Sequence, residues 1–242
     1  MEVSKKIQFI SNWIKNYVQT MPNKAESLVV GISGGIDSSV SSTLSAMTGL
    51  KTIVLSMPIK QKSIQHDLSL KHQEWLIKKF KNVEAHTINL DKLFETFENS
   101  LSKFDNDHGM ANSRARLRMI TLYQVATANK GIVVGTGNKV EDFGVGFYTK
   151  YGDGGVDISP IADCNKSDVW EMGKELDILK EIIDADPTDG LWDDGRTDEG
   201  QLGLKYSELE EAMNNPNSSN REKYEKIRKL NLHKMEPIPV CK

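Results

Sequence analysis

The chain has 242 residues, of which 38% are hydrophobic and 27% charged, a balance that indicates a globular protein rather than a collagen-like, coiled-coil or disordered one. This length predicts one domain over residues 1–242 with a large buried core. The formal net charge of −3, without a dense cluster of Lys and Arg, argues against nucleic acid as a partner.

Neither a membrane segment nor a secretion signal is evident along the sequence. The first 18 residues interrupt their apolar positions with Gln, Ser, Asn and Lys, and no stretch approaches the roughly 20 apolar residues of a membrane span. Cys164 and Cys241 lie far apart without a CxxC partner, so we expect two free thiols rather than a disulfide or a zinc site. The protein is expected to be cytoplasmic, with no membrane partner.

Strand and helix patterns alternate through the first 136 residues. Apolar residues three and four apart predict an amphipathic first helix, at Ile7, Ile10, Ile14 and Val18. Short strands are expected at residues 27–32, 52–56, 84–90 and 131–136, and the first and last of these are expected to be buried. Helices are expected at about 40–47 with a cap at Gly49, and at 63–80, 93–101 and 111–128. Right-handed crossovers between such units predict an α/β fold, a twisted parallel sheet with helices on both faces.

Beyond residue 136 the periodic patterns give way to Gly and Asp. Residues 137–157 are expected to form an ordered functional loop, and residues 186–203 a second aperiodic segment that could be a mobile lid. Further helices are expected from a cap at Asn165 or Ser167 to Ile178, from a capping box of Ser207 and Glu210, and over about 221–230. The prolines that follow should stop the last helix.

The string GISGGIDSS, residues 31–39, lies between the first strand and the next helix. A glycine-rich turn in this position exposes backbone N–H groups that converge on an anion, helped by the positive end of the helix. Ser33, Ser38 and Ser39 add hydroxyl donors, and the Asp37 carboxylate suits Mg²⁺ held against phosphate oxygens. An ordinary capped turn is the alternative. The run of small and acidic residues favours a phosphate loop that is neither a Walker A loop nor a GxGxxG motif.

The SGGIDSS string resembles the signature of N-type ATP pyrophosphatases, whose fold is Rossmann-like and typical of adenine nucleotide α-hydrolases. Within that superfamily, residues 112–119 (NSRARLRM), 135–161, 186–203 and the terminal His-Lys pair resemble ammonia-dependent NAD⁺ synthetases. The resemblance covers essentially the whole chain. It implies ATP-dependent amidation of deamido-NAD⁺ (nicotinate adenine dinucleotide) by ammonia to NAD⁺, the last step of NAD⁺ biosynthesis. The reaction passes through an acyl-adenylate and releases pyrophosphate and AMP.

The resemblance also implies the residues that bind each ligand. ATP would contact Gly31, Ile32, Ser33, Gly34, Gly35, Ile36, Asp37, Ser38, Thr136, Lys166 and Thr188. Deamido-NAD⁺ would contact Arg116, Lys150, Asp157, His233 and Lys234, with Arg118 a weaker candidate. The implied cofactor is Mg²⁺, held by the carboxylates of Asp37 and Glu141.

Three residues are candidates for a catalytic role: Asp153, Ser33 and Asp37. Asp153, in the string YGDGG, is the candidate for binding or deprotonating ammonium, because that role requires a carboxylate close to the attacking nitrogen. A turn-forming Asp is the alternative interpretation.

The implied partners are ATP, deamido-NAD⁺ and ammonia. Free ammonia is expected because glutamine-dependent members carry an extra amidohydrolase domain, for which this chain has no room; a separate glutaminase subunit stays an alternative. The resemblance further implies a homodimer, with the first helix and the helix after Met110 at the interface.

Two rival functions stay open at this point. Another pyrophosphatase, such as a tRNA-thiolating enzyme or the synthetase half of GMP synthetase, would share the phosphate loop, but thiolation favours reactive cysteines and a basic surface. A non-catalytic nucleotide sensor of the universal-stress type would need neither Glu141 nor the YGDGG segment.

Overall fold

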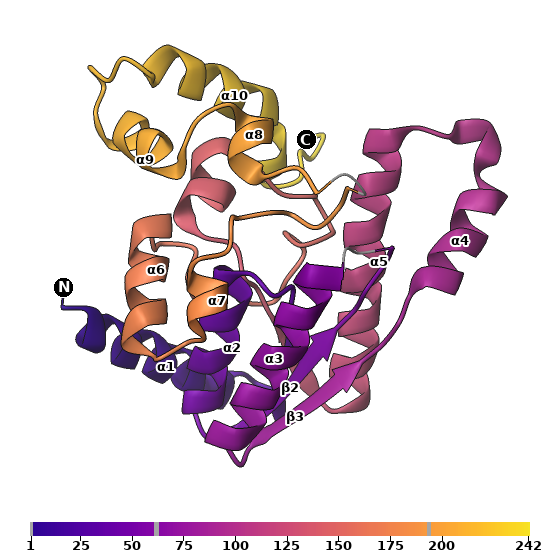
Figure 1. Cartoon of the computed structure of the whole chain (residues 1–242), viewed down its shortest axis with the longest axis vertical. Helices are drawn as coiled ribbons and strands as arrows, with labels where there is room; N and C mark the ends of the chain where they lie inside the picture. Colours follow the sequence, from indigo (N-terminus) through magenta and orange to yellow (C-terminus); the bar gives the residue numbers. More distant parts are fainter. Residues whose placement is uncertain (1, 61–62, 193–194) are drawn as a thin grey trace.

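A computed structural model describes residues 2–60, 63–192 and 195–242. Four parallel strands in the described part of the chain form a central sheet in the order β3-β2-β1-β4 (Figure 1). The strands are β1 (Ser27–Gly31), β2 (Lys51–Ser56), β3 (Val83–Thr87) and β4 (Gly131–Val134). Parallel neighbours require crossover connections, and the chain supplies them as helices. The α/β fold expected from the sequence is confirmed.

Both faces of the sheet are covered because successive strand residues point to opposite sides. Leu28 and Val30 of β1 pack into one core cluster, together with the inner residues of the first two helices. Val29 faces the other way and packs with Leu122 and Phe94. Alternate residues of a continuous apolar strand such as β1 therefore pack into two separate layers of the core.

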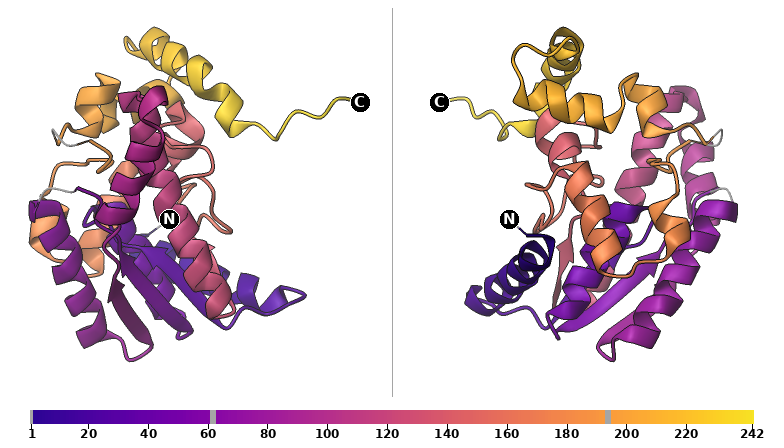
Figure 2. Two further views of the ribbon diagram at one scale, coloured as in Figure 1. Left: turned by 90° about the vertical axis from the view of Figure 1, so that its right-hand side faces the viewer. Right: turned by 60° about the vertical axis from the view of Figure 1, so that its left-hand side comes forward.

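The helices fall into three groups. One face of the sheet carries α1 (Val3–Thr20), α2 (Ile36–Met47), α3 (Ser63–Lys79), α6 (Lys166–Glu175) and α7 (Lys180–Ile183). The other face carries α4 (Asp91–Ser100) and α5 (Asp107–Ala128), joined by the short 3-10 helix η1 (Ser102–Phe104). A third cluster contains the π-helix η2 (Val140–Val145), α8 (Asp198–Leu202), α9 (Tyr206–Asn214) and α10 (Arg221–Met235). Figures 1 and 2 show α8, α9 and α10 gathered at one end of the molecule, and the tail after α10 extending away from it.

Several helix boundaries differ from the prediction. The helix α5 begins four residues early because the side chain of Asn106 accepts a hydrogen bond from the Gly109 N–H at 2.8 Å. The helix α6 ends at Glu175 rather than Ile178, and Asp177 adopts a left-handed conformation with φ of 57°. The end of α2 is as expected, since Gly49 follows it with φ of 77°.

The predicted capping box of Ser207 and Glu210 is wrong. The carboxylate of Glu208 instead accepts the Lys205 N–H at 2.7 Å, so α9 begins at Tyr206. Glu210 accepts hydrogen bonds from the backbone and hydroxyl of Ser167, at the start of α6.

Residues 137–157 are not wholly irregular, because they contain η2, and residues 186–203 contain α8. Both cysteines are free thiols, as predicted. No described helix is long and apolar enough to span a bilayer.

Candidate active site

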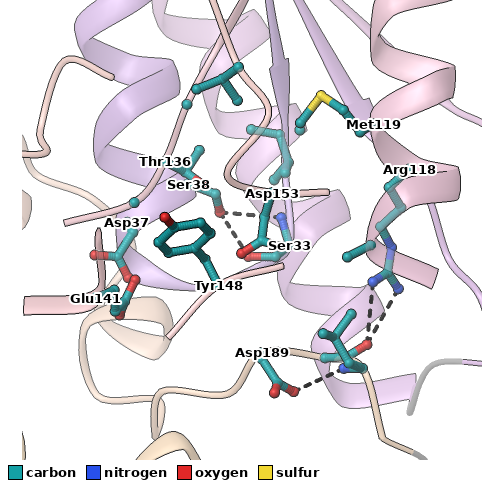
Figure 3. Close-up of a pocket in the computed structure, with 18 of the residues that line it drawn as sticks. Ser33, Asp37, Ser38, Arg118, Met119, Thr136, Glu141, Tyr148, Asp153 and Asp189 are labelled. Atoms are coloured by element: carbon teal, nitrogen blue, oxygen red, sulfur yellow. Dashed lines mark hydrogen bonds between the residues drawn. The ribbon is translucent and has the colours of Figure 1, made fainter. Parts of the chain in front are cut away.

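A cavity of about 210 Å³ opens at the carboxyl ends of β1 and β4. This edge of an open parallel sheet is where α/β proteins bind ligands. Its walls come from the loop after β1, the segment after β4, one side of α5 and residues 188–191. Figure 3 shows Asp37 and Glu141 on one side of the cavity, and Arg118 and Met119 on another.

The loop after β1 reaches the N-terminus of α2 through two consecutive glycines. Gly34 adopts a left-handed conformation with φ of 92°, which an L-residue seldom does, and Gly35 is the N-cap of α2. The hydroxyl of Ser38 lies 3.0 Å from that of Ser33 and 3.2 Å from the Ser33 N–H. The loop therefore ends at the positive end of a 12-residue helix, with hydroxyls at its rim, as a phosphate site requires.

Only part of the predicted phosphate loop faces the cavity. Gly31, Ile32, Ser33, Asp37 and Ser38 line it. The side chain of Ile36 is buried in the core cluster beside α1 and α2, so its contribution to a nucleotide site would have to come from the backbone. Thr136 and Thr188, the two isolated threonines predicted to contact ATP, also line the cavity.

Lys166 lies behind the cavity, at the start of α6, and is 1% exposed. Its ammonium contacts Asp37 Oδ2 at 2.6 Å and Glu141 Oε1 at 3.1 Å. Asn138 donates to the other oxygen of Asp37 at 3.1 Å. Burial lowers the pKa of Lys166, but the two carboxylates raise it by more, so the lysine stays charged. The two predicted metal carboxylates, on α2 and η2 and 104 residues apart in the sequence, are thus brought together.

The residues around Lys166 fit a divalent cation. Burial, opposed by Lys166, raises the pKa of Glu141, and its neighbours Asp37 and Asp142 add negative charge. Mg²⁺ prefers carboxylate oxygens and uses one or two of them together with water and phosphate. In the described ranges no three or more His, Cys, Asp or Glu side chains converge as a complete metal site. Asp37 and Glu141 could therefore hold Mg²⁺ only with further oxygens from a bound nucleotide.

Asp153 lies in the cavity wall, where its Oδ1 accepts the Thr149 N–H at 3.0 Å. Asp153 is an exposed residue of the cavity wall, and its carboxylate lies close to Glu141 and Asp189, whose charges act on it. Desolvation raises its pKa to about 6, against the hydrogen bonds that lower it. A carboxylate with this pKa is deprotonated at neutral pH and remains able to accept a proton.

Asp142 was not predicted as a site residue, yet it lines the cavity beside Glu141. Burial and then Glu141 raise its pKa to about 7. A Cβ at Gly137 would lie 2.2 Å from an Asp142 oxygen, so the Asp142 carboxylate would have to move if Gly137 were replaced. The sequence places Asp142 directly after Glu141, but no spacing rule marks it as a cavity residue.

Two arginines of α5 hold residues 190–191 over the cavity. Arg118 donates to the Met57 carbonyl at 3.1 Å and to the Gly190 carbonyl at 3.4 Å. Arg114 donates to the Leu191 carbonyl at 2.9 Å. Burial lowers the pKa of Arg118 to about 10, which still leaves it charged. Arg118, the weaker candidate from the sequence, thus lines the cavity.

Most of the residues predicted to contact deamido-NAD⁺ lie together, away from the cavity lining. Arg116 donates to the Lys150 carbonyl at 3.2 Å, and Lys150 reaches the His233 carbonyl at 3.4 Å. Lys234 donates to the carbonyl of Tyr148, a cavity residue, at 2.7 Å. Asp157 lies apart, where it accepts the Val133 N–H at 2.7 Å and the Tyr123 hydroxyl at 3.0 Å.

Residues 6–241 match a family model described as NAD synthase. The chain belongs to the NAD synthase family. An NH(3)-dependent NAD(+) synthetase of Alkaliphilus metalliredigens is 35% identical, with 99% of each chain covered. The corresponding protein of Thermoplasma volcanium is 38% identical, over 76% of this chain and 74% of that protein.

Two solved structures extend the comparison. The NMN synthetase from Francisella tularensis superposes with a TM-score of 0.91 at 34% identity, covering 100% of this chain and 99% of that one. The NH3-dependent NAD synthetase from Campylobacter jejuni has a TM-score of 0.80 at 22% identity, with 100% of both chains covered, and supports the fold alone. As a member of the NAD synthase family, the chain is an amide-forming, ATP-binding ligase of NAD⁺ biosynthesis, as its motifs predicted.

Proposed function

We propose that this protein amidates deamido-NAD⁺ with ammonia to form NAD⁺, at the expense of ATP. The observation that carries the proposal is the convergence of a phosphate loop, two carboxylates suited to Mg²⁺ and Asp153 on one cavity. The cavity thus offers a place for a triphosphate, a cation and an amine within reach of one another. A nucleotide sensor would need only the first of these.

In the first step, an oxygen of the nicotinate carboxylate would attack the α-phosphorus of ATP, and pyrophosphate would leave. The backbone of residues 31–38 and the hydroxyls of Ser33 and Ser38 would orient the phosphate chain. Mg²⁺ held by Asp37 and Glu141 would supply neutralisation of the phosphate charge. Lys166 keeps these two carboxylates in place from behind.

In the second step, the nitrogen of ammonia would attack the acyl carbon, and AMP would leave. Ammonium must lose a proton before it can attack, and the resulting amide loses another. Asp153 is the proposed residue for binding ammonium and receiving its proton, because its carboxylate faces the cavity and its pKa is about 6.

The dinucleotide is the proposed substrate, and nicotinate mononucleotide is the second candidate. The relatives at 35–38% identity named NAD(+) synthetases support the dinucleotide. The structure at 34% identity and TM-score 0.91, named an NMN synthetase, favours the mononucleotide. The cluster of Arg116, Lys150, His233 and Lys234 is the proposed site for the rest of the dinucleotide.

The decisive experiment is to incubate the protein with ATP, Mg²⁺ and ammonium, and with deamido-NAD⁺ or nicotinate mononucleotide in parallel. The proposal requires NAD⁺ and AMP in equal amounts, and a higher kcat/KM for the dinucleotide. A higher kcat/KM for the mononucleotide would select the second candidate. AMP formed without either acid would favour a rival function.

Three further expectations belong to the same proposal. The 242 residues form one catalytic domain, free ammonia is the nitrogen donor, and the active form is a homodimer that uses α1 and α5 at its interface. Exposed apolar residues on both helices support the last of these, at Phe9, Trp13 and Tyr17 of α1 and Ile120 of α5.

A further inference from the structure

Tyr206, the first residue of α9, is buried in the third core cluster and is 1% exposed. Its hydroxyl lies 2.5 Å from Glu141 Oε1 and 3.1 Å from Asp198 Oδ2. Burial raises the pKa of this hydroxyl far above its usual range, so it keeps its proton and acts as a donor. A neutral donor thus touches a carboxylate that the proposed function uses.

The two protein donors of Glu141 bind the same oxygen. Lys166 and Tyr206 both reach Oε1, at 3.1 and 2.5 Å. In the described part of the chain, Oε2 of Glu141 makes no hydrogen bond and no ion pair, although Glu141 lines the cavity. Oε1 of Glu141 is thus held by two donors, and Oε2 is left for a ligand in the cavity.

We propose that Tyr206 is a positioning residue, whose hydroxyl fixes the Glu141 carboxylate so that Oε2 can bind a divalent cation. This proposal rests on the proposed function in one respect, which is that the cation is Mg²⁺ bound together with ATP. Tyr206 itself does not line the cavity, so it acts through Glu141 rather than on a substrate.

Lys166 divides its ammonium between two carboxylates. Its ammonium is shared with Asp37, which it contacts at the shorter distance of 2.6 Å. The ring of Tyr206 lies under the same ammonium, with Nζ 4.4 Å from its centroid, and packs edge-on against Trp170. The Tyr206 N–H donates to Glu199 at 2.9 Å. Tyr206 is therefore held in place by several contacts, and it supports Glu141, the carboxylate that Lys166 contacts at the longer distance.

The hydroxyl also separates two carboxylates. Asp198, 5% exposed at the start of α8, approaches Tyr206 from the segment of residues 186–203. The Tyr206 hydroxyl lies 2.5 Å from the Glu141 carboxylate and 3.1 Å from that of Asp198, so it stands between two groups of like charge. Without the hydroxyl, Glu141 would lose a donor and would be free to rotate away from Asp198.

The test replaces only the hydroxyl, by Tyr206→Phe, and measures Mn²⁺ affinity by electron paramagnetic resonance in the presence of α,β-methylene-ATP. Mn²⁺ is the probe for Mg²⁺, and the methylene bridge prevents cleavage of the nucleotide. We expect the Mn²⁺ dissociation constant to rise by about tenfold or more, as is typical when a residue supporting a metal ligand is lost. In turnover, the Mg²⁺ concentration for half-maximal rate should rise more than kcat falls.

The matched control is Tyr224→Phe. Tyr224 is another buried tyrosine of the same cluster, but its hydroxyl reaches the Gly144 carbonyl, at 3.4 Å, rather than Glu141. Its Mn²⁺ affinity should stay within about twofold of the wild type. In a Glu141→Gln background, Tyr206→Phe should cause no further loss of affinity, because the two changes remove the same interaction.

Unchanged Mn²⁺ affinity in Tyr206→Phe would overturn the proposal, and so would an equal loss in Tyr224→Phe. A Tyr206→Phe protein that fails to fold would assign the hydroxyl to stability and would also overturn it. A wild-type protein that binds Mn²⁺ and the nucleotide analogue but forms no NAD⁺ would instead contradict the proposed function, while the affinity comparison still tests the position of Glu141.

Discussion

Asp153 combines a place in the cavity wall with a pKa of about 6, so its charge matters most for a step that moves a proton. We predict that Asp153→Asn keeps adenylate formation but loses amidation by about 100-fold or more, a typical effect of removing a catalytic base. The measurement compares pyrophosphate release with NAD⁺ formation in the same samples. Normal NAD⁺ formation by this variant would show that the carboxylate only shapes the turn.

The raised pKa of Asp198 leads to a prediction of how the stability of the fold changes with pH. Its pKa is raised from 3.8 to about 7, first by burial and then by Glu141, so between these values the folded chain holds a proton that the unfolded chain has released. Stability from this group is therefore present below about pH 4 and falls as pH rises to about 7. Asp198→Asn removes the titration. We predict that, between pH 4.5 and pH 7.5, the free energy of unfolding of the wild type falls by on the order of 1 kcal/mol or more relative to that of the variant.

Urea unfolding in the presence of EDTA, at both pH values, would measure this difference. The control is Asp105→Asn, at an exposed position before α5, which should follow wild type at both pH values. A gap between wild type and Asp198→Asn that stays constant with pH would contradict the assignment of the raised pKa.

The sequence predicted individual site residues where a contiguous motif carried them. The string GISGGIDSS marked Ser33, Asp37 and Ser38, and all three line the cavity. Tyr206 and Asp198 carried no such mark, because their role depends on α8 and α9 folding back onto η2. The contact of Tyr206 with Glu141 joins residues 65 apart in the sequence, whereas periodicity reports only on neighbours along one element.

The π-helix η2 is the element on which the carboxylates depend, since it carries both Glu141 and Asp142. Its end is fastened to α10, where Asn231 donates to the Val145 carbonyl at 3.0 Å and Arg228 donates to the Gly144 carbonyl at 2.7 Å. π-helices are rare and frequently lie at functional sites. No sequence pattern separates a π-helix from a loop, which is why residues 137–157 were expected to form an ordered loop.

Gly146 ends this π-helix in a left-handed conformation, with φ of 68°. A Cβ there would lie 2.6 Å from the Met235 side chain and 2.7 Å from that of Asn231, both on α10. We predict that Gly146→Ala destabilises the fold by about 1–3 kcal/mol more than Gly49→Ala, because it adds a clash to the strain. Gly49 has a similar φ of 77°, but nothing lies within 4 Å of its Cβ position.

Chemical denaturation of the two glycine variants would measure the comparison. Equal losses of unfolding free energy would mean that α10 moves aside to admit the methyl group. The packing of α10 on η2 would then be looser than the contacts of Gly146 indicate.

At the scale of the whole molecule, the sheet and its two helical layers followed from strand and helix periodicity, because apolar patterning decides which surfaces are buried. The third cluster did not follow. Its short helices, α8 and α9, have five and nine residues and are joined to the body through η2 and Lys166 rather than through a long apolar stripe. The cavity lies where this cluster meets the sheet. Its lining residues could therefore be identified only from the tertiary structure.

The first helix, α1, has apolar side chains that are not buried in the core. Ile7, Ile10 and Ile14 pack inward, while Phe9 on the opposite side is 61% exposed, followed one and two turns later by Trp13 and Tyr17. On α5, Ile120 is 66% exposed beside a shallow hollow that includes Tyr123 and Tyr151. Helices with apolar residues on two faces usually bury both. A second copy of the chain would cover these surfaces, as the proposed homodimer requires.

We therefore predict that the protein sediments at twice the 27.1 kDa of one chain, and that the double variant Trp13→Glu, Ile120→Glu is monomeric. A glutamate buried in each copy of a symmetric interface would be desolvated without a partner, which costs several kcal/mol per charge. The control is Ile77→Glu, at an apolar position on α3 whose exposure of 50% lies between those of Trp13 and Ile120, and this variant should remain dimeric. A monomeric wild type at micromolar concentration, or a dimeric double variant, would contradict the use of these two helices as the interface.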